Sequence, residues 1–328
     1  MTSLSRRHLV AGFLGVGAGL LGRDVFAQSA RLLKIGALTE SWGPTPAVVG
    51  LRDGLQELGH REDKDFTIGV RFTGGKIADL PAAARDLVRH RVDVIVTTES
   101  GAAAKAAQLA TNQIPIVFVG SGDPVRLGLV QSLARPGSNI TGIADLDIDL
   151  VPKRMELFRD LIPGLKRVLV PYDATNSDAV AQMAVHREAA RRLGLTLMER
   201  PVRGEDEARA TIIGLRKGEA DGIFSLRFLT SNIPGFILQI APRRVMPTMF
   251  HYPFFVERGG LASYSANSYE LGKRAARLVD KILRGHKPAD LPVEQPLKFE
   301  LVINLKTAKA LGLTVPPSFL LRADRLIQ

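Results

Sequence analysis

Short, largely apolar runs alternate with amphipathic segments along most of the chain. The pattern predicts strands at 33–38, 66–72, 92–96 and 114–119. Apolar positions spaced three and four residues apart predict helices between them, at 47–58, 80–88 and 102–110. Such alternation is typical of a parallel sheet with helices on both faces, so the pattern places the chain in the α/β class.

The loop after the fourth run is the first candidate for a binding site. Gly120-Ser121-Gly122 allows the backbone to turn closely, and Asp123-Pro124 is typical of a helix start, with Asp as N-cap and Pro at the first position. The sequence therefore predicts a fourth strand–helix step before Gly142. In α/β sheets, ligands bind beyond the carboxyl ends of strands.

The same pattern restarts near residue 146, which predicts a second α/β lobe. Its predicted strands are 168–170, 195–198, 223–226, 246–250 and 299–303. Its predicted helices are 151–161, 179–193, 206–216, 236–241, 269–283 and 305–311. The expected fold is therefore two doubly wound parallel-sheet lobes.

The amino terminus has the pattern of an export signal over residues 1–27. Arg6-Arg7 precedes an apolar run at 9–21, and Val25-Phe26-Ala27 supplies small residues for cleavage. The run is shorter than the roughly 20 residues that a membrane span needs. A twin-arginine and a general secretory route both stay open, and either leads to the periplasm. With no cysteine in the chain, no lipid-modified thiol can anchor it, so we expect a free monomer.

Charge and motifs argue against nucleic-acid binding and catalysis. The net charge is +11, and loss of residues 1–27 leaves +9, but the basic residues are scattered rather than gathered in a stripe. The Gly-rich pattern at 17–22 lies inside the export signal, and no nucleophile elbow or phosphate loop occurs. The six histidines are dispersed, so we expect no metal, no cofactor and no enzyme activity.

Three sequence segments carry a resemblance to a known family. They are 123–142, from Asp-Pro-Val to Asn-Ile-Thr-Gly; 259–264, Gly-Gly-Leu-Ala-Ser-Tyr; and 287–304, continued by 306–311 and Pro316-Pro317. On these motifs the chain resembles periplasmic solute-binding proteins of the ATP-binding-cassette (ABC) importer class, in the family that includes tryptophan- and phenylalanine-binding members.

The resemblance implies a type I periplasmic binding protein fold. In this fold three crossing segments join two lobes, and the lobes close on a ligand. Lobe one would combine 31–145 with about 262–286, and lobe two would combine 146–261 with about 287–328. Two departures leave the ligand open: Gly137-Ser138 stands where two glycines are common, and Ser265-Ala266 where a glycine commonly follows Tyr264.

Loops that follow the predicted strands supply the candidate ligand-binding residues. These are Ser41, Trp42, Thr98, Glu99, Ser100, Ser121, Asp123, Tyr172, Asn176, Arg227 and His251. A helix N-terminus at Ser100 or the guanidinium of Arg227 suits a carboxylate, whereas Glu40, Glu99 or Asp123 suits an ammonium. Other roles stay open for five of these residues: helix capping for Ser100 and Asp123, packing for Trp42, and a surface or hinge role for Arg227 and His251.

These features together predict the solute-binding component of an ABC importer. It would capture a small organic solute, an amino acid or an aromatic carboxylate, between its lobes and deliver it to permease subunits. Two alternatives remain: a ligand-sensing periplasmic receptor for a signalling partner, and, less favoured, a periplasmic hydrolase.

Overall fold

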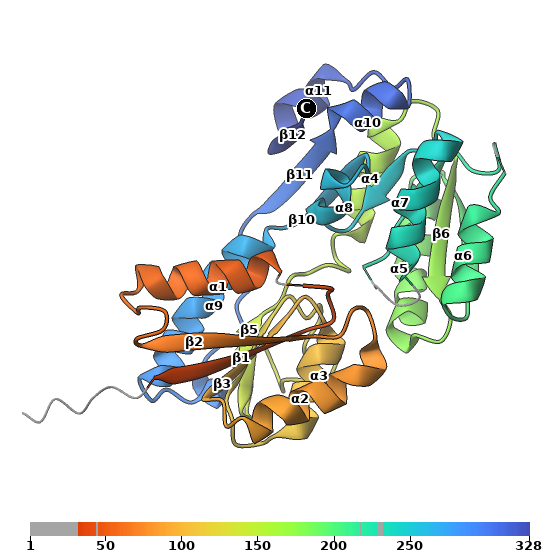
Figure 1. Cartoon of the computed structure of the whole chain (residues 1–328). Coiled ribbons are helices and arrows are strands. Elements are labelled where there is room, and N and C mark those ends of the chain that lie inside the picture. Colours follow the sequence, from red (N-terminus) through yellow and green to blue (C-terminus); the bar gives the residue numbers. More distant parts are fainter. Residues whose placement is uncertain (1–31, 44, 217, 228–231) are drawn as a thin grey trace, which may run out of the picture. The chain divides into compact units, whose positions relative to one another are not determined.

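The computed structural model describes residues 32–43, 45–216, 218–227 and 232–328. The predicted export signal lies outside these residues. The described chain forms two mostly parallel β-sheets, each covered by helices on both faces (Figure 1). We call each sheet with its helices a lobe.

The first lobe contains a five-stranded parallel sheet in the order β2-β1-β3-β4-β5. Its strands are β1 (Leu33–Thr39), β2 (Phe66–Phe72), β3 (Val94–Thr98), β4 (Ile116–Val119) and β5 (Ile140–Ile143). Its helices are α1 (Pro46–Glu57), α2 (Leu80–Arg89), α3 (Gly101–Ala110) and α9 (Ser268–Leu283), with a 3₁₀ turn, η1, at Ile77–Asp79. Helices α1 and α9 share one apolar core with the sheet, and α2 and α3 share another.

Helices α1 and α9 pack closely because glycines stand at their contact. A Cβ atom at Gly50 would lie 2.0 Å from the Tyr269 carbonyl oxygen, and one at Gly272 would lie 2.0 Å from the Ala47 carbonyl oxygen. This contact attaches α9, from late in the chain, to the first lobe.

The second lobe contains a seven-stranded sheet in the order β12-β11-β10-β9-β8-β6-β7. Its strands are β6 (Arg167–Asp173), β7 (Thr196–Val202), β8 (Gly222–Phe224), β9 (Thr248–Phe250), β10 (Ala262–Ala266), β11 (Phe299–Asn304) and β12 (Arg325–Ile327). Only β10 and β11 pair antiparallel. Its helices are α4 (Val151–Leu161), α5 (Ser177–Arg192), α6 (Glu205–Ile213), α7 (Ile233–Arg244), α8 (Pro253–Glu257), α10 (Leu305–Ala310) and α11 (Pro317–Arg322).

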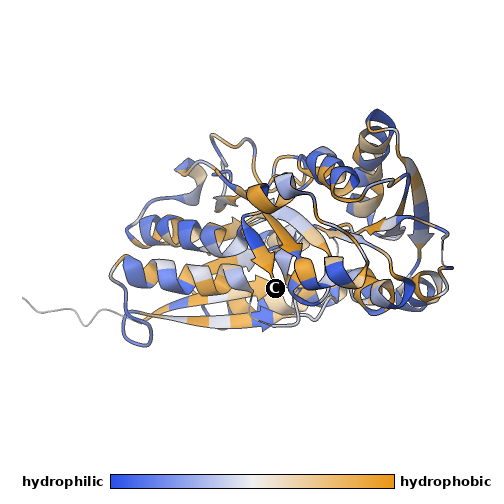
Figure 2. Cartoon of the chain, turned by 90° about the horizontal axis from the view of Figure 1, so that it is seen from above, coloured by the Kyte–Doolittle hydropathy of each residue, from blue (hydrophilic) through white to orange (hydrophobic). Residues whose placement is uncertain are grey.

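Both lobes are built on the same strand order, because β7-β6-β8-β9-β10 repeats the order of the first sheet. Apolar residues of the strands and of the covering helices pack into shared cores. Figure 2 shows that the helices carry both hydrophilic and hydrophobic residues. The predicted pair of doubly wound lobes is therefore confirmed.

One local prediction is wrong, and one strand of the first sheet was not predicted. No helix follows β4: residues 124–128 form turns, which end where Gly128 takes a left-handed conformation (φ +63°). The sequence also gave no prediction for β5, because Thr141 and Gly142 interrupt its apolar pattern.

The strands also show where the chain passes between the lobes. Strand β10 belongs to the second sheet, and α9 packs on the first. The 3₁₀ turn η3 (Pro288–Asp290) and the residues after it stay with the first lobe, since Leu291 packs in its core and Glu294 bridges to Ile143. The segment predicted for lobe one at about 262–286 thus runs from about 267 to 295.

Candidate functional site

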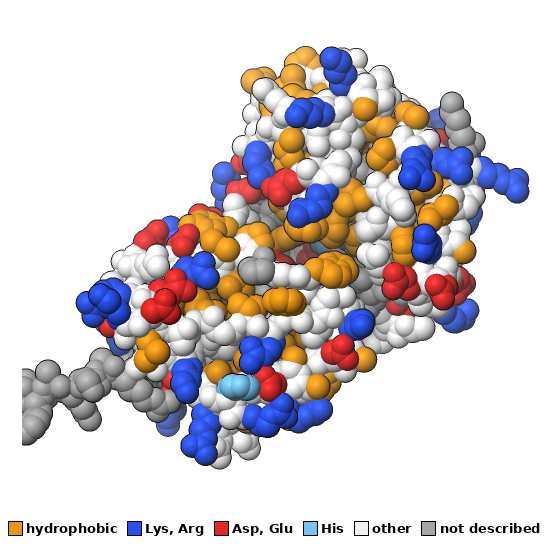
Figure 3. Space-filling model, viewed as in Figure 1, with side chains coloured by type: hydrophobic (Ala, Val, Ile, Leu, Met, Phe, Trp, Pro, Cys, Tyr) orange, Lys and Arg blue, Asp and Glu red, His pale blue; other side chains and the backbone are white. Residues whose placement is uncertain are grey.

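The carboxyl ends of the strands of both sheets border a cavity of about 350 Å³. Strand order reverses between β1 and β3 in the first sheet and between β6 and β8 in the second, which is where α/β sheets bind ligands. Loops after β1, β3, β4 and β9 line the cavity, together with Arg227, shortly after β8, and the crossing segments after β5 and β10. Figure 3 shows hydrophobic side chains gathered around this hollow.

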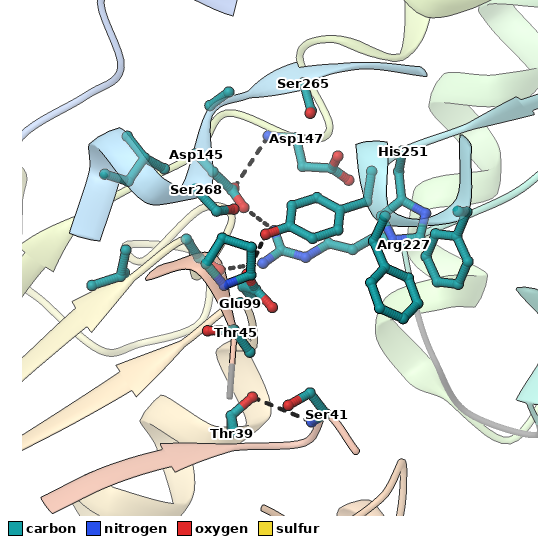
Figure 4. Close-up of a pocket in the computed structure, with 18 of the residues that line it drawn as sticks. Thr39, Ser41, Thr45, Glu99, Asp145, Asp147, Arg227, His251, Ser265 and Ser268 are labelled. Atoms are coloured by element: carbon teal, nitrogen blue, oxygen red, sulfur yellow. Dashed lines mark hydrogen bonds and ion pairs between the residues drawn. The ribbon is translucent and has the colours of Figure 1, made fainter. Parts of the chain in front are cut away.

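Four carboxyl groups of the wall face a single buried guanidinium. They are Glu40, Glu99, Asp145 and Asp147, all of which interact electrostatically with Arg227 of the second lobe. Figure 4 shows Glu99, Asp145 and Asp147 around this side chain. Nη1 of Arg227 lies 2.5 Å from an Asp145 carboxylate oxygen, and its Nη2 donates to the Gly120 carbonyl. The wall therefore carries more carboxyl groups than Arg227 alone can balance.

Glu99 is held in an unusual conformation and an unusual protonation state. Its backbone is left-handed (φ +61°), which is rare outside glycine and is common at functional sites. Burial raises the pKa of its carboxyl from 4.5 to about 7, although the Tyr252 hydroxyl, which donates to Oε1, opposes that rise. Tyr252 follows β9 and Glu99 follows β3, so this hydrogen bond joins the two lobes.

Glu40 is held by the first turn of α3. Ser100 caps that helix: its Oγ accepts from the Ala103 N–H at 3.2 Å and donates to the Glu40 carboxylate at 3.1 Å. Burial raises the pKa of Glu40 as well. A positive charge that enters the cavity would therefore stabilise the ionised forms of both carboxyl groups.

Two further polar groups of the wall have no hydrogen-bond partner among the described residues. They are Nδ1 of His251 and Oγ of Ser265, both buried. Burial lowers the pKa of His251 to about 3, so its ring is neutral at physiological pH. Buried polar atoms without partners are rare, and here they offer hydrogen bonds to a molecule in the cavity.

Aromatic side chains form the outer part of the cavity. Trp42, which is 52% exposed, lines the cavity together with Phe254 and Phe255 of α8. The Arg258 guanidinium lies 3.4 Å from the centre of the Phe254 ring, a cation–π contact that holds this ring in place. Such a wall suits a flat or apolar group.

Arg154 fixes the crossing segments behind the wall. This fully buried side chain of α4 bonds to an Asp147 carboxylate oxygen at 2.6 Å and to the Tyr264 carbonyl at 2.8 Å. It thereby joins the crossing after β5 to strand β10. Burial acts to raise the pKa of Asp147, but Arg154 and Arg227 hold it below its ordinary value.

A second cavity of about 380 Å³ lies between the N-termini of α3 and α5. Ser100 and Asn176 cap these helices, and Asn176 accepts from the Asp178 and Ala179 N–H groups. Ser121 is buried, and its hydroxyl has no partner among the described residues. Asp123 is exposed at the rim, and its carboxylate accepts from the Val125 and Arg126 N–H groups, so it caps a turn rather than a helix.

The predicted ligand residues thus divide between the two cavities. Ser41, Trp42 and His251 line the first; Ser100, Ser121, Asp123 and Asn176 line the second; Glu99 and Arg227 line both. Thr98 and Tyr172 line neither. Thr98 is buried beneath the first cavity beside Thr45, with their hydroxyls 3.2 Å apart, and Tyr172 packs against the core of the second lobe.

Several residues of the first cavity were not among the sequence candidates. Asp145 and Asp147 follow β5, which the pattern did not predict, so their place at a strand end gave no signal. Ser265 lies in β10 and Ser268 follows it, and this strand was also not predicted. Tyr252 could have been found, because it lies beside His251 in a loop already singled out.

The described residues contain no group of acidic, histidine or cysteine side chains placed to hold a metal ion. Across the same described residues, no helix is both long and apolar enough to span a membrane.

Comparison with known proteins gives consistent matches over nearly the whole chain. Residues 37–327 match the family model of ABC transporter substrate-binding proteins. A tyrosine-binding protein of Clostridioides difficile is 27% identical over 320 residues, covering 93% of this chain and 91% of that one. The structural matches include a conserved domain protein of Vibrio cholerae (29% identity, TM-score 0.82) and a Streptococcus pneumoniae ABC domain in complex with L-Trp (27%, 0.81).

Each of these two structures is covered completely by 90% of this chain. More distant solute-binding proteins share the fold alone, such as one of Agrobacterium vitis with bound allitol (16% identity, TM-score 0.57). The two lobes are thus those of the type I periplasmic binding proteins.

Proposed function

The chain belongs to the family of ABC transporter substrate-binding proteins, and we propose that it captures an α-amino acid with an aromatic side chain. The observation that carries this proposal is the first cavity, where four carboxyl groups and one arginine lie beside an aromatic wall. Such a wall offers separate places for the charged and the flat parts of one small molecule.

The carboxyl groups favour an ammonium. Glu40 and Glu99 have raised pKa values because burial disfavours their charged forms, and Arg227 is already paired with Asp145. A solute ammonium placed between Glu40 and Glu99 would restore their charge and form charge-assisted hydrogen bonds. A neutral sugar would leave this cluster uncompensated.

The rest of the cavity suits the other parts of an aromatic amino acid. The Ser265 hydroxyl has no partner among the described residues and can donate to a carboxylate, while the Arg227 guanidinium supplies positive charge in the same wall. Trp42, Phe254 and Phe255 offer faces for offset or edge-to-face contact with a ring. The names of two relatives, one tyrosine-binding and one solved with L-Trp, support this solute class.

Delivery to an importer follows from the family and from the sequence. We propose that the predicted export signal sends the protein to the periplasm, and that the lobes close on the solute and present it to permease subunits. Ion pairs and hydrogen bonds across the cleft, such as Arg227 to Asp145 and Tyr252 to Glu99, would then stabilise the closed state.

A thermal-shift screen of the purified protein against amino acids, aromatic carboxylates, amides and sugars tests the proposal. A solute at 100 times its dissociation constant adds about 2.7 kcal/mol of stability, which corresponds to a rise of several degrees in Tm. We expect this rise with tyrosine, tryptophan or phenylalanine. Stabilisation by sugars alone, or by no solute, would contradict the proposal.

A further inference from the structure

The two cavities of the cleft meet at a partition of four side chains. Glu40, Glu99, Asp147 and Arg227 line both cavities. Glu40 and Glu99 follow strands of the first sheet, and Asp147 belongs to the crossing after β5. Arg227 alone comes from the second lobe, so its side chain completes the partition when the lobes are together.

The guanidinium of Arg227 lies at the border itself. Its Nη2 donates to the carbonyl of Gly120, which lines the first cavity, and its Nη1 lies 3.8 Å from the position of a Cβ atom on Gly122, which lines the second. Both glycines have positive φ, 75° and 76°, and no side chain, so the turn after β4 leaves room for the planar group.

Arg227 is fixed in this place by charge. Its side chain is 12% exposed and pairs with Asp145 at 2.5 Å. Burial acts to lower the pKa of Arg227, but Asp145 and Asp147 raise it above its ordinary value, so the group stays charged. While the lobes are closed, withdrawing the guanidinium would leave the Asp145 carboxylate largely buried without its partner, which disfavours that movement.

The second cavity differs chemically from the first. Its own wall combines uncharged hydroxyl and amide groups with one basic and two acidic side chains: Ser100, Ser121, Thr175, Asn176 and Gln182, with Arg126, Asp123 and Asp178. The hydroxyl of Ser121, in a residue that is 4% exposed, has no partner among the described residues. These groups match the amide and terminal carboxylate of a second amino-acid residue, and the second cavity has no aromatic lining.

We propose that Arg227 sets the length of the solute: its guanidinium separates a subsite for one amino acid from a polar subsite that would fit a following residue. The protein therefore takes single amino acids and rejects dipeptides, whose second residue would have to displace the Arg227–Asp145 pair. This inference rests on the proposed function for the identity of the first residue.

Isothermal titration with L-tyrosine and L-tyrosylglycine tests the inference, because both probes carry the ammonium on the tyrosine. The native protein should bind the dipeptide at least 100-fold more weakly than tyrosine. The double variant Arg227→Ala, Asp145→Asn removes the guanidinium from the partition without leaving Asp145 as an unpaired charge, and should reduce this ratio at least tenfold. Arg200→Ala, which breaks an ion pair with Glu219 outside both cavities, should leave the ratio unchanged.

An unchanged ratio in the folded double variant overturns the inference. Binding of neither probe by the native protein would instead count against the proposed function. In that case a crystal structure of the double variant decides about the partition without any solute. One continuous cavity from Trp42 to Asn176 supports the role of Arg227, and two separate cavities overturn it.

Discussion

Replacing Glu99 by glutamine should stabilise the empty protein. The pKa of Glu99 is about 7 in the folded chain against 4.5 for an ordinary glutamate. A carboxyl group whose pKa is raised by folding lowers the free energy of unfolding at every pH where the unfolded chain ionises it. This loss of stability is absent below pH 4.5, grows between pH 4.5 and 7, and is constant above pH 7. At about 1.4 kcal/mol per pKa unit, its limit is about 3 kcal/mol. Glu99→Gln should therefore gain up to about 3 kcal/mol at pH 8 and little at pH 4.5.

The same variant should bind an aromatic amino acid more weakly. Loss of a hydrogen bond to a charged group corresponds to about 1.5–3 kcal/mol, or roughly 10-fold to 150-fold in affinity. Since the ammonium requires an ionised partner, native affinity should rise up to about tenfold per pH unit from pH 5 to 7 and level off above. Glu99→Gln should lose this dependence apart from the share of Glu40; His251, with a pKa of about 3, titrates outside this range.

Urea denaturation at pH 4.5, 6.5 and 8, with isothermal titration from pH 5 to 8, measures both effects. Glu257→Gln is the matched control, since this residue is exposed and pairs with Arg325 at 2.7 Å outside both cavities. A variant of Glu99 that is less stable at pH 8, or that binds the solute as tightly as the native protein with the same pH profile, would refute the reasoning.

Three further substitutions test the hinge, the aromatic wall and the capping role. Arg154→Met leaves Asp147 buried without its partner and should lower the free energy of unfolding in urea by about 3–5 kcal/mol. The control Arg159→Met, at an exposed ion pair on the same helix, should change it by less than about 0.5 kcal/mol. Equal effects of the two substitutions would contradict the hinge role. Trp42→Ala should weaken the binding of aromatic solutes about threefold to tenfold but leave the binding of aliphatic ones unchanged. Because Trp42 is the only tryptophan, the fluorescence emission of the native protein should change on binding. An equal loss of affinity for both solute types would contradict the role of Trp42 in the aromatic wall. Asp123→Ala should cost about 1 kcal/mol of stability with solute affinity kept within twofold, and a tenfold loss by titration would show direct contact instead.

Most strands that could be predicted from the sequence contain a run of large apolar residues, such as β3 and β4. Strand β10 was missed because its residues Ala-Ser-Tyr-Ser-Ala alternate small and polar groups that are nevertheless buried. Since Ser265 lies in this strand, the missed element removed a site residue from view.

Strand ends limited the prediction of the site. Strand β3 continues through Thr98, which is β-branched and fully buried, so the loop begins two residues later than the apolar run suggested. Strand β6 likewise includes Tyr172. Asp123-Pro124 fits a turn as well as a helix start, and the sequence could not separate these, because Gly128 ends the segment before a helix forms. Arg227 was found as a strand-end residue, but its pairing with Asp145 depends on how the two lobes meet.

Titration of the purified protein with L-tyrosine, L-tryptophan and L-phenylalanine, each beside its analogue lacking the amino group, tests the central claim most directly. The claim is that the carboxyl groups around Glu99 hold a solute ammonium while the aromatic wall holds its ring. We predict one-to-one binding of at least one of the amino acids, and at least tenfold weaker binding of its deaminated analogue. Equal binding of the two, or binding of the analogue alone, would contradict it.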